Sequence, residues 1–240
     1  MLLQIISDTH SDLSRFKPNP RADLIVHAGD FTKTDDSLVQ IYKFVTKCEE
    51  ANKKYVFVLG NHDYYNQDRE ELINILEEDN INILYAGKEY HQDGYIFVGD
   101  TLFTEFKLPE FNNVELNKKI AEVYVSDFIY TKYSADDYAN MFKEQLDFIN
   151  KYKHKDNVIV ITHFSPSQKT ITDKWKGDIL NPYFSNDISL IGFKHWICGH
   201  QHHTDLYDVD GCNIYINASG YSNSYMYECQ NFNDKFVIKV

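Results

Sequence analysis

The chain has 240 residues, of which 43% are hydrophobic, and its formal net charge is −12. This length and apolar content suffice for one large domain with its own core, and they exclude an intrinsically disordered chain. The acidic balance argues against strong, non-specific nucleic-acid binding, because phosphate backbones require lysine and arginine. No signal peptide or membrane-spanning segment is expected, and the 4 cysteines lack CxxC spacing, so we expect a cytoplasmic protein with reduced thiols.

Predicted strands and helices alternate through the first third of the chain. Strands are expected over residues 2–7, 23–27 and 54–59, where short runs rich in Ile, Val and Leu end on polar or glycine-containing clusters. Helices are expected over 34–52 and 68–78, where apolar residues recur at helical spacing. This alternation is typical of α/β proteins.

The middle of the chain contains a predicted hairpin, an insertion and a long helix. Residues 87–93 and 94–99 are expected to pair around an Asp-Gly turn. Residues 101–134 have weak periodicity, and we expect an insertion there with one or two helices near the mouth of a site. An amphipathic helix is predicted over 135–152.

The C-terminal third is predicted to consist mainly of strands. Buried strands are expected over 157–162 and 194–198. Shorter runs follow, two of them joined by an Asp-Gly turn, and they predict an antiparallel meander over 205–209, 212–217, 226–229 and 235–240. No repeat or linker divides the chain, so we predict one mixed α/β domain over residues 1–240, with the insertion at about 101–134.

Side chains that can bind metal ions follow five of the predicted strands. Asp8 and His10 form one pair at i and i+2, and an extended backbone points both side chains of such a pair the same way. Ligands in α/β sheets gather at the carboxyl ends of strands, which is where these side chains fall. The candidate metal ligands are Asp8, His10, Asp30, Asn61, His163, His200 and His202.

The types and number of these side chains indicate a site for two metal ions. Carboxylates, imidazoles and one amide oxygen suit borderline divalent ions, unlike an all-oxygen calcium site or a thiolate site. Seven ligands exceed what one structural zinc takes, but they suit two ions that share a bridging carboxylate. Such a pair, about 3.5–4 Å apart, suits displacement at phosphorus. Mn²⁺ is the favoured ion, with Zn²⁺, Fe²⁺, Ni²⁺ and Co²⁺ as alternatives.

Five motifs occur in the order of a known family. They are Asp8-x-His10, Gly29-Asp30, Gly60-Asn61-His62-Asp63, His163 and Gly199-His200-x-His202. Through them the chain resembles the calcineurin-like metallophosphoesterase superfamily from residue 8 to residue 202, and the stretches 99–104 and 162–181 resemble a bacterial and phage branch of small members. No arginine follows Asp30 as the Asp-Arg-Gly motif of the protein phosphatases would require, which disfavours activity on phosphoproteins.

The resemblance implies a fold, a ligand assignment and a reaction. The fold would be a four-layer αββα sandwich of two mixed β-sheets flanked by helices. Asp30 would bridge the two metals. The other ligands would divide into Asp8, His10 and His202 for one metal and Asn61, His163 and His200 for the other. A metal-bridging water would attack the phosphate, and His62 would stabilise the transition state and protonate the leaving oxygen.

Residues beside the motifs carry further expectations. Asp63 is expected either to orient His62 for catalysis or to cap the helix that follows. The rings of Tyr64 and Phe164 lie next to motif loops and could stack a nucleotide base, with core packing as the alternative. The candidate substrate-binding residues are Asn61, His62, Tyr64 and Phe164.

We therefore expect a phosphoesterase that acts on a small phosphomonoester, with nucleoside monophosphates as the favoured class, or on a simple phosphodiester. The insertion and the loop 165–183 are expected to close the site, with Glu105, Glu110 and Glu115 repelling long polyanions. The alternatives are a nuclease, a cyclic-nucleotide phosphodiesterase and an inactive scaffold, and the last is disfavoured because no ligand is missing. No membrane partner and no strong nucleic-acid binding are expected.

Overall fold

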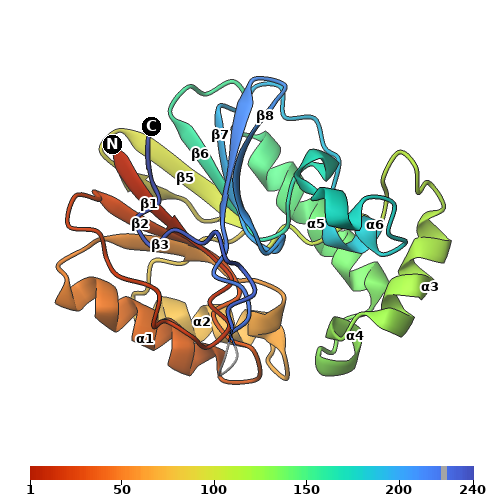
Figure 1. The fold of residues 1–240 in the computed structure, drawn as a ribbon, viewed down its shortest axis with the longest axis horizontal. Coiled ribbons are helices and arrows are strands. Elements are labelled where there is room, and N and C mark those ends of the chain that lie inside the picture. The colour runs from red at the N-terminus through yellow and green to blue at the C-terminus, as the bar shows by residue number, and fades with distance from the viewer. Residues whose placement is uncertain (223–225) are drawn as a thin grey trace.

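Two mixed β-sheets lie face to face at the centre of the fold, with helices on their outer sides (Figure 1). The computed structural model describes residues 1–222 and 226–240. The strand order is β10-β1-β2-β3 in the first sheet and β4-β5-β6-β7-β9-β8 in the second. The four-layer αββα sandwich predicted from the sequence is therefore confirmed.

Each sheet has a parallel centre and an antiparallel edge. In the first sheet β1, β2 and β3 are parallel and β10 pairs antiparallel with β1. In the second sheet β5, β6, β7 and β9 are parallel, and β4 and β8 are the antiparallel edge strands. The strands are β1 (Leu2–Ile6), β2 (Leu24–Ala28), β3 (Tyr55–Val58), β4 (Tyr90–Gln92), β5 (Tyr95–Asp100), β6 (Val158–Thr162), β7 (His195–Cys198), β8 (Thr204–Val209), β9 (Cys212–Asn217) and β10 (Val237–Lys239).

The apolar runs form strands because both of their faces are buried. In β1, Leu3 and Ile5 point between the sheets and pack with residues of the second sheet such as Ile159. The alternate residue Ile6 points outward, into the cluster that contains Phe44 of the first helix. Burial of one such side chain contributes about 1.5–3 kcal/mol, so these layers hold the strand ends in fixed positions.

The helices cover the outer faces and build a lobe at one side. Helices α1 (Ser37–Glu50) and α2 (Arg69–Glu78) pack on the first sheet, and α5 (Ala135–Asn150) packs on the second. The expected insertion forms α3 (Val114–Tyr124) and α4 (Asp127–Tyr130), which lie beside α5 and α6 (Asn181–Phe184) in Figure 1. Short 3₁₀ turns span His62–Tyr64, Gln168–Thr170 and Asp173–Trp175. No helix in the described part of the chain is long and apolar enough to span a membrane.

The predicted C-terminal meander is wrong. Of the four runs expected in it, β8 and β9 do form a hairpin, but β9 pairs parallel with β7, and β10 belongs to the other sheet. Residues 226–229 form no strand; Tyr227 makes an isolated bridge with Ser222, and Glu228 hydrogen-bonds His202. Alternation of apolar residues shows that a strand has one buried face, but it does not show which strand lies beside it.

Candidate dinuclear metal centre

The sheets bring all seven predicted metal ligands together at one edge. Each ligand follows the carboxyl end of β1, β2, β3, β6 or β7, and these ends meet where the two sheets face each other. Five of the seven are buried, with His200 and His202 partly exposed toward a cleft. One edge of a layered α/β fold therefore presents carboxylate, imidazole and amide groups to a common space.

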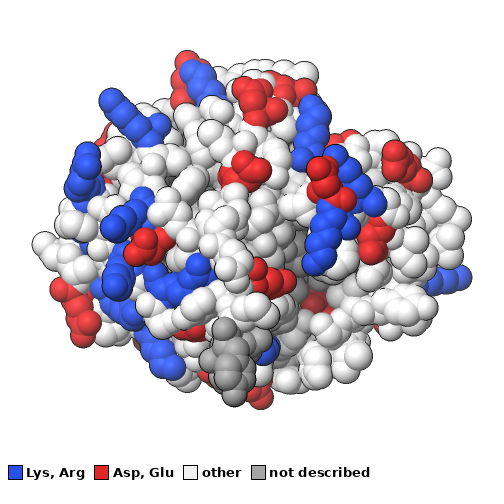
Figure 2. Space-filling view, in the orientation of Figure 1, with Lys and Arg blue, Asp and Glu red and all other residues white. Residues whose placement is uncertain are grey.

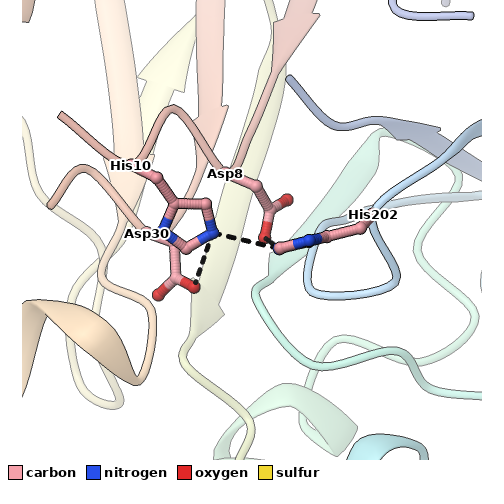
Figure 3. A group of neighbouring side chains, drawn as sticks. All are labelled: Asp8, His10, Asp30 and His202. Atoms are coloured by element: carbon pink, nitrogen blue, oxygen red, sulfur yellow. Dashed lines mark hydrogen bonds and ion pairs between the residues drawn. The ribbon is translucent and has the colours of Figure 1, made fainter. Parts of the chain in front are cut away.

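The first ligand group consists of Asp8, His10, Asp30 and His202 (Figure 3). The Nε2 atoms of His10 and His202 lie 3.0 Å apart. Nε2 of His10 is 3.7 Å from Oδ2 of Asp30, and Nε2 of His202 is 3.3 Å from Oδ1 of Asp8. One ligand atom of each residue lies within 4.8 Å of the others, so the lone pairs converge on a space that fits a divalent cation.

The second group consists of Asp30, His163 and His200, with Asn61 beside it. Nε2 of His163 lies 3.4 Å from Oδ2 of Asp30 and 2.9 Å from Oδ1 of Asn61. Nε2 of His200 is buried and has no hydrogen-bond partner among the described residues. A buried orphan nitrogen is costly unless something binds it, and a metal ion would satisfy it. Asp30 belongs to both groups, as a bridging ligand must.

Burial and charge control the protonation of the imidazoles. Burial lowers the pKa of His10 to about 3 and holds the pKa of His200 well below its usual range, so both rings are neutral near pH 7. Burial also opposes protonation of His163, but the adjacent Asp30 outweighs it and raises the pKa to about 9. Carboxylates likewise raise the pKa of His202 to about 10. A bound cation would displace these last two protons.

The ligands sit on unusual backbone. Asp8, Asp30 and His200 have φ values of +53°, +60° and +65°, and the histidines at 10 and 202 have +42° and +46°. Residues with a Cβ rarely adopt this left-handed region, and each instance costs on the order of 1–3 kcal/mol. Five such residues at one point are typical of functional sites, where strained backbone clusters.

Two glycines explain how the ligand loops approach each other. Gly29 has φ +87°, and a Cβ there would lie 2.6 Å from Nδ1 of His163. A Cβ on Gly60 would overlap the carboxylate of Asp30. The glycines before Asp30 and Asn61 are therefore required by close backbone packing.

In three of the candidate ligand histidines, Nδ1 contacts an oxygen atom that orients the ring. Nδ1 of His10 lies 3.2 Å from the Thr32 carbonyl, and Nδ1 of His163 lies 2.8 Å from the Ala28 carbonyl. Nδ1 of His202 lies 2.7 Å from Oε2 of Glu228. A proton on Nδ1 leaves the Nε2 lone pair directed at the centre, which is how metal-binding histidines are oriented.

His62 lies beside the ligand groups but belongs to neither. Its Nε2 is 3.1 Å from the hydroxyl of Tyr221 and its ring centroid is 4.8 Å from that of His10. Its backbone N–H donates to Oδ1 of Asp30 at 3.0 Å. Its Nδ1 has no partner among the described residues. The imidazole therefore faces the same space as the ligands without being one.

Asp63 has neither of the two roles expected of it. Its carboxylate accepts hydrogen bonds from the backbone N–H groups of Asp30, Phe31, Thr32 and Gly60, at 2.9–3.2 Å. The cap of α2 is Asp68. Asp63 thus ties the loop of Asp30, the carboxylate common to both groups, to the loop that carries His62.

Tyr64 and Phe164 are core residues. Tyr64 is 1% exposed and its hydroxyl hydrogen-bonds Thr101 at 2.7 Å. Phe164 is 0% exposed and stacks on His200 with centroids 4.1 Å apart. Neither ring is among the described residues that line the cleft beside the centre, so the expectation that they stack a base is corrected, and core packing was the right alternative.

Three contacting residues were missed by the sequence analysis. Tyr221 reaches His62 and stacks on His10, with centroids 4.1 Å apart. Glu228 holds His202, and Asp127 accepts a hydrogen bond from Asn61 at 2.9 Å. None of the three lies in a motif. A single tyrosine or acid in a chain with 18 tyrosines and 36 acidic residues carries no positional signal.

A cleft of about 420 Å³ opens from this centre. His62, Tyr221 and four of the predicted ligands line it, and so do residues of the insertion, of the loop before α6 and of α6 itself, such as Tyr124, Trp175 and Phe184. Figure 2 shows this face hollowed between the sheets and the lobe of α3 and α4.

Glu105, Glu110 and Glu115 are absent from the described lining, so the acidic rim expected from them is wrong. Asp178 and Glu228 are acidic lining residues instead, and no lysine or arginine is among the described lining residues.

Comparisons with known proteins agree with this geometry. Residues 2–204 match the model of the family described as calcineurin-like phosphoesterase. An uncharacterized protein of Acanthamoeba polyphaga mimivirus is 27% identical, with 100% of this chain and 96% of that protein covered. The fold is similar to the phosphopantetheinyl hydrolase of Mycobacterium tuberculosis, with a TM-score of 0.68, 16% identity and coverage of 91% of this chain and 89% of that one. A dimetal phosphatase from Danio rerio has a TM-score of 0.50, 15% identity and coverage of 90% and 86%. The chain therefore belongs to the calcineurin-like phosphoesterase family.

Proposed function

We propose that this chain hydrolyses small phosphate esters with the help of two divalent metal ions. The observation that carries the proposal is the pair of ligand groups that share Asp30 and open into one cleft beside His62. One ion would be held by Asp8, His10 and His202, and the other by Asn61, His163 and His200. Two such ions would activate a water molecule and neutralise the phosphate oxygens.

His62 is the proposed proton donor. It lines the cleft and lies next to both ligand groups, and its side chain is not needed to hold a metal. A general acid must reach the leaving oxygen directly, and a group on the cleft wall can do so. Tyr221, whose hydroxyl meets Nε2 of His62, would hold the ring in place.

The cleft supports a substrate with one phosphate and a small organic group. Tyr124 and Trp175 are 69% and 51% exposed and line the cleft, where they can pack against a planar or apolar group. Because no lysine or arginine is among the described lining residues, further phosphates would find no cationic partner. These features favour a nucleoside monophosphate or a simple diester over a polynucleotide.

The metal and the compartment are part of the proposal. Mn²⁺ is the proposed ion because imidazole, carboxylate and amide ligands suit it, with Zn²⁺, Fe²⁺, Ni²⁺ and Co²⁺ as alternatives. A reducing cytoplasm is proposed because all 4 cysteines are free and buried.

A substrate panel with added Mn²⁺ tests the function. We expect kcat/KM to be highest for a nitrophenyl phosphate, a nucleoside monophosphate or a small diester such as a cyclic nucleotide. An oligonucleotide and a phosphopeptide should be much poorer substrates. Asp30→Asn should abolish the activity, since it removes the shared carboxylate. No hydrolysis of any ester by the wild-type protein would refute the proposal, and a preference for the oligonucleotide would make the chain a nuclease.

A further inference from the structure

Asp127 is a buried carboxylate that the insertion delivers to the metal centre. It is the first residue of α4 and is 1% exposed. Its Oδ1 accepts from the amide of Asn61 at 2.9 Å and from the hydroxyl of Tyr65 at 2.7 Å. Its Oδ2 accepts from the hydroxyls of Tyr138, at 3.1 Å, and Tyr183. No lysine or arginine of the described chain forms an ion pair with it.

We propose that Asp127 is a positioning residue that fixes which end of the Asn61 carboxamide faces the metal; this rests on the proposed function. An amide can present either its oxygen or its nitrogen, and only the oxygen can bind a cation. A carboxylate accepts hydrogen bonds and cannot donate them, so the amide nitrogen must face Asp127. The oxygen is then turned to the other side, where it lies 2.9 Å from Nε2 of His163.

The same carboxylate also influences the proposed proton donor, through the Tyr65 ring. Asp127 accepts a hydrogen bond from the hydroxyl of Tyr65 and so fixes the Tyr65 ring. The centroid of this ring lies 4.4 Å from that of the His62 ring. The second anchor of this hydroxyl is Oγ of Ser126, at 3.1 Å. The insertion therefore supports both a metal ligand and His62, in addition to lining the cleft.

Four neutral donors explain how a carboxylate can stay buried here. Loss of water around an anion is expensive unless each oxygen gains hydrogen bonds, and each oxygen of Asp127 has two. These donors come from three separate segments, because Asn61 and Tyr65 follow β3, Tyr138 lies in α5 and Tyr183 lies in α6. Asp127 is thus held rigidly enough to impose an orientation on Asn61.

A double-mutant cycle on Mn²⁺ affinity tests this role. In Asn61→Asp two carboxylates would face each other, and we expect Mn²⁺ at one of the two sites to bind about 10-fold or more weakly. In Asn61→Asp combined with Asp127→Asn the hydrogen bond is restored in the opposite direction. Relative to Asp127→Asn alone, the Asn61→Asp change should then weaken Mn²⁺ binding by less than about 3-fold. Calorimetric titration of the purified proteins with MnCl₂ gives these affinities.

Tyr138→Phe provides the matched control, because it removes a donor from Oδ2 of Asp127 and leaves Oδ1 and Asn61 untouched. In the Tyr138→Phe background, Asn61→Asp should weaken Mn²⁺ binding as much as it does in the wild type. Circular dichroism shows whether each variant is folded. If Asn61→Asp weakens Mn²⁺ binding equally in the wild-type protein and in the Asp127→Asn variant, the positioning role is overturned. This holds even if the wild type binds two ions and hydrolyses esters. A wild type that binds no Mn²⁺ overturns this inference and the proposed function together.

Discussion

The histidines at the centre differ in how their second ring nitrogen is held. Nδ1 of His10, His163 and His202 meets a carbonyl or carboxylate oxygen, which fixes the tautomer and keeps Nε2 available to a cation. His62 has no such anchor: its Nδ1 is unpartnered among the described residues, and its Nε2 meets the hydroxyl of Tyr221. A hydroxyl can donate or accept, so either protonation state of His62 is accommodated. This suits a group that gives up a proton in each cycle.

Replacement of His62 should lower turnover in proportion to how much the leaving group needs a proton. His62→Asn should retain both metals, because the side chain is in neither ligand group. We expect kcat for an alkyl or nucleoside ester to fall by about 10²–10⁴-fold and kcat for a nitrophenyl ester to fall much less. Steady-state kinetics and metal analysis of the same preparation measure both effects. Equal losses for the two esters would show that His62 supports the site without donating a proton.

The residues of the centre were predictable where a local sequence pattern, such as a strand followed directly by a polar residue, indicates them. Asp8, Asp30 and His163 follow recognisable strands, and their spacing is visible in the sequence. Tyr221 and Asp127 reach the centre only through the tertiary fold, 159 residues from His62 in the first case and 66 from Asn61 in the second. Contacts over such separations depend on how loops close, which local spacing does not encode.

The elements predicted most accurately were the helices with a strong hydrophobic periodicity and the strands with two buried faces. The strand expected at 157–162 is β6 (Val158–Thr162), and the helix expected at 135–152 is α5 (Ala135–Asn150). The insertion has the one or two helices expected of it. The segment 226–229 has the alternation of a strand, but its residues serve other contacts, such as that of Glu228 with His202. A requirement of the site overrides local propensity there.

The first turn of α5 offers a test of stability at this scale. Oγ of Ser134 accepts from the backbone N–H of Asp137 at 3.2 Å, and Oδ2 of Asp137 accepts from the backbone N–H of Ser134 at 2.8 Å. Ser134→Ala should lower the free energy of unfolding by about 1 kcal/mol, as loss of a cap does. Ser134→Thr keeps the hydroxyl, so it should retain most of the wild-type free energy of unfolding. Urea unfolding measures the difference, and equal midpoints for the Ala and Thr variants would show that the cap contributes nothing.

The contribution of this cap to stability depends on pH. Hydrogen bonds from Ser134 hold the pKa of Asp137 below its ordinary value of 3.8. A carboxyl with a lowered pKa stabilises the fold above its ordinary pKa, and the contribution is lost as the pH falls through the lowered value. The effect of Ser134→Ala should therefore be measured near pH 7, where the contribution is complete.

At the scale of the whole molecule, the site concentrates negative charge in the interior. Asp8, Asp30 and Asp127 are each at most 1% exposed, and in the described part of the chain none forms an ion pair with lysine or arginine. Burial and the nearby Asp30 raise the pKa of Asp63 to about 7, so this fourth buried carboxyl carries less charge. Burial of carboxylates without cations costs several kcal/mol each unless hydrogen bonds and opposite charges compensate. Two divalent cations would supply four positive charges at this point. The fold thus has a thermodynamic reason to bind metals apart from catalysis.

Removal of metal should therefore destabilise the protein as well as inactivate it. A ligand that binds only the folded state, present at 100 times its Kd, stabilises that state by about 2.7 kcal/mol, which for a chain of this size is about 5–10 °C in Tm. We expect Tm measured with excess Mn²⁺ to exceed Tm measured with EDTA by at least this amount. Asp30→Asn should lose most of the difference because the carboxylate shared by both groups is gone. Asp173→Asn removes an exposed carboxylate, 93% accessible, and should keep the wild-type difference. A Tm that is the same in Mn²⁺ and EDTA would mean that hydrogen bonds and the protonated rings of His163 and His202 stabilise the buried carboxylates as well as metal does.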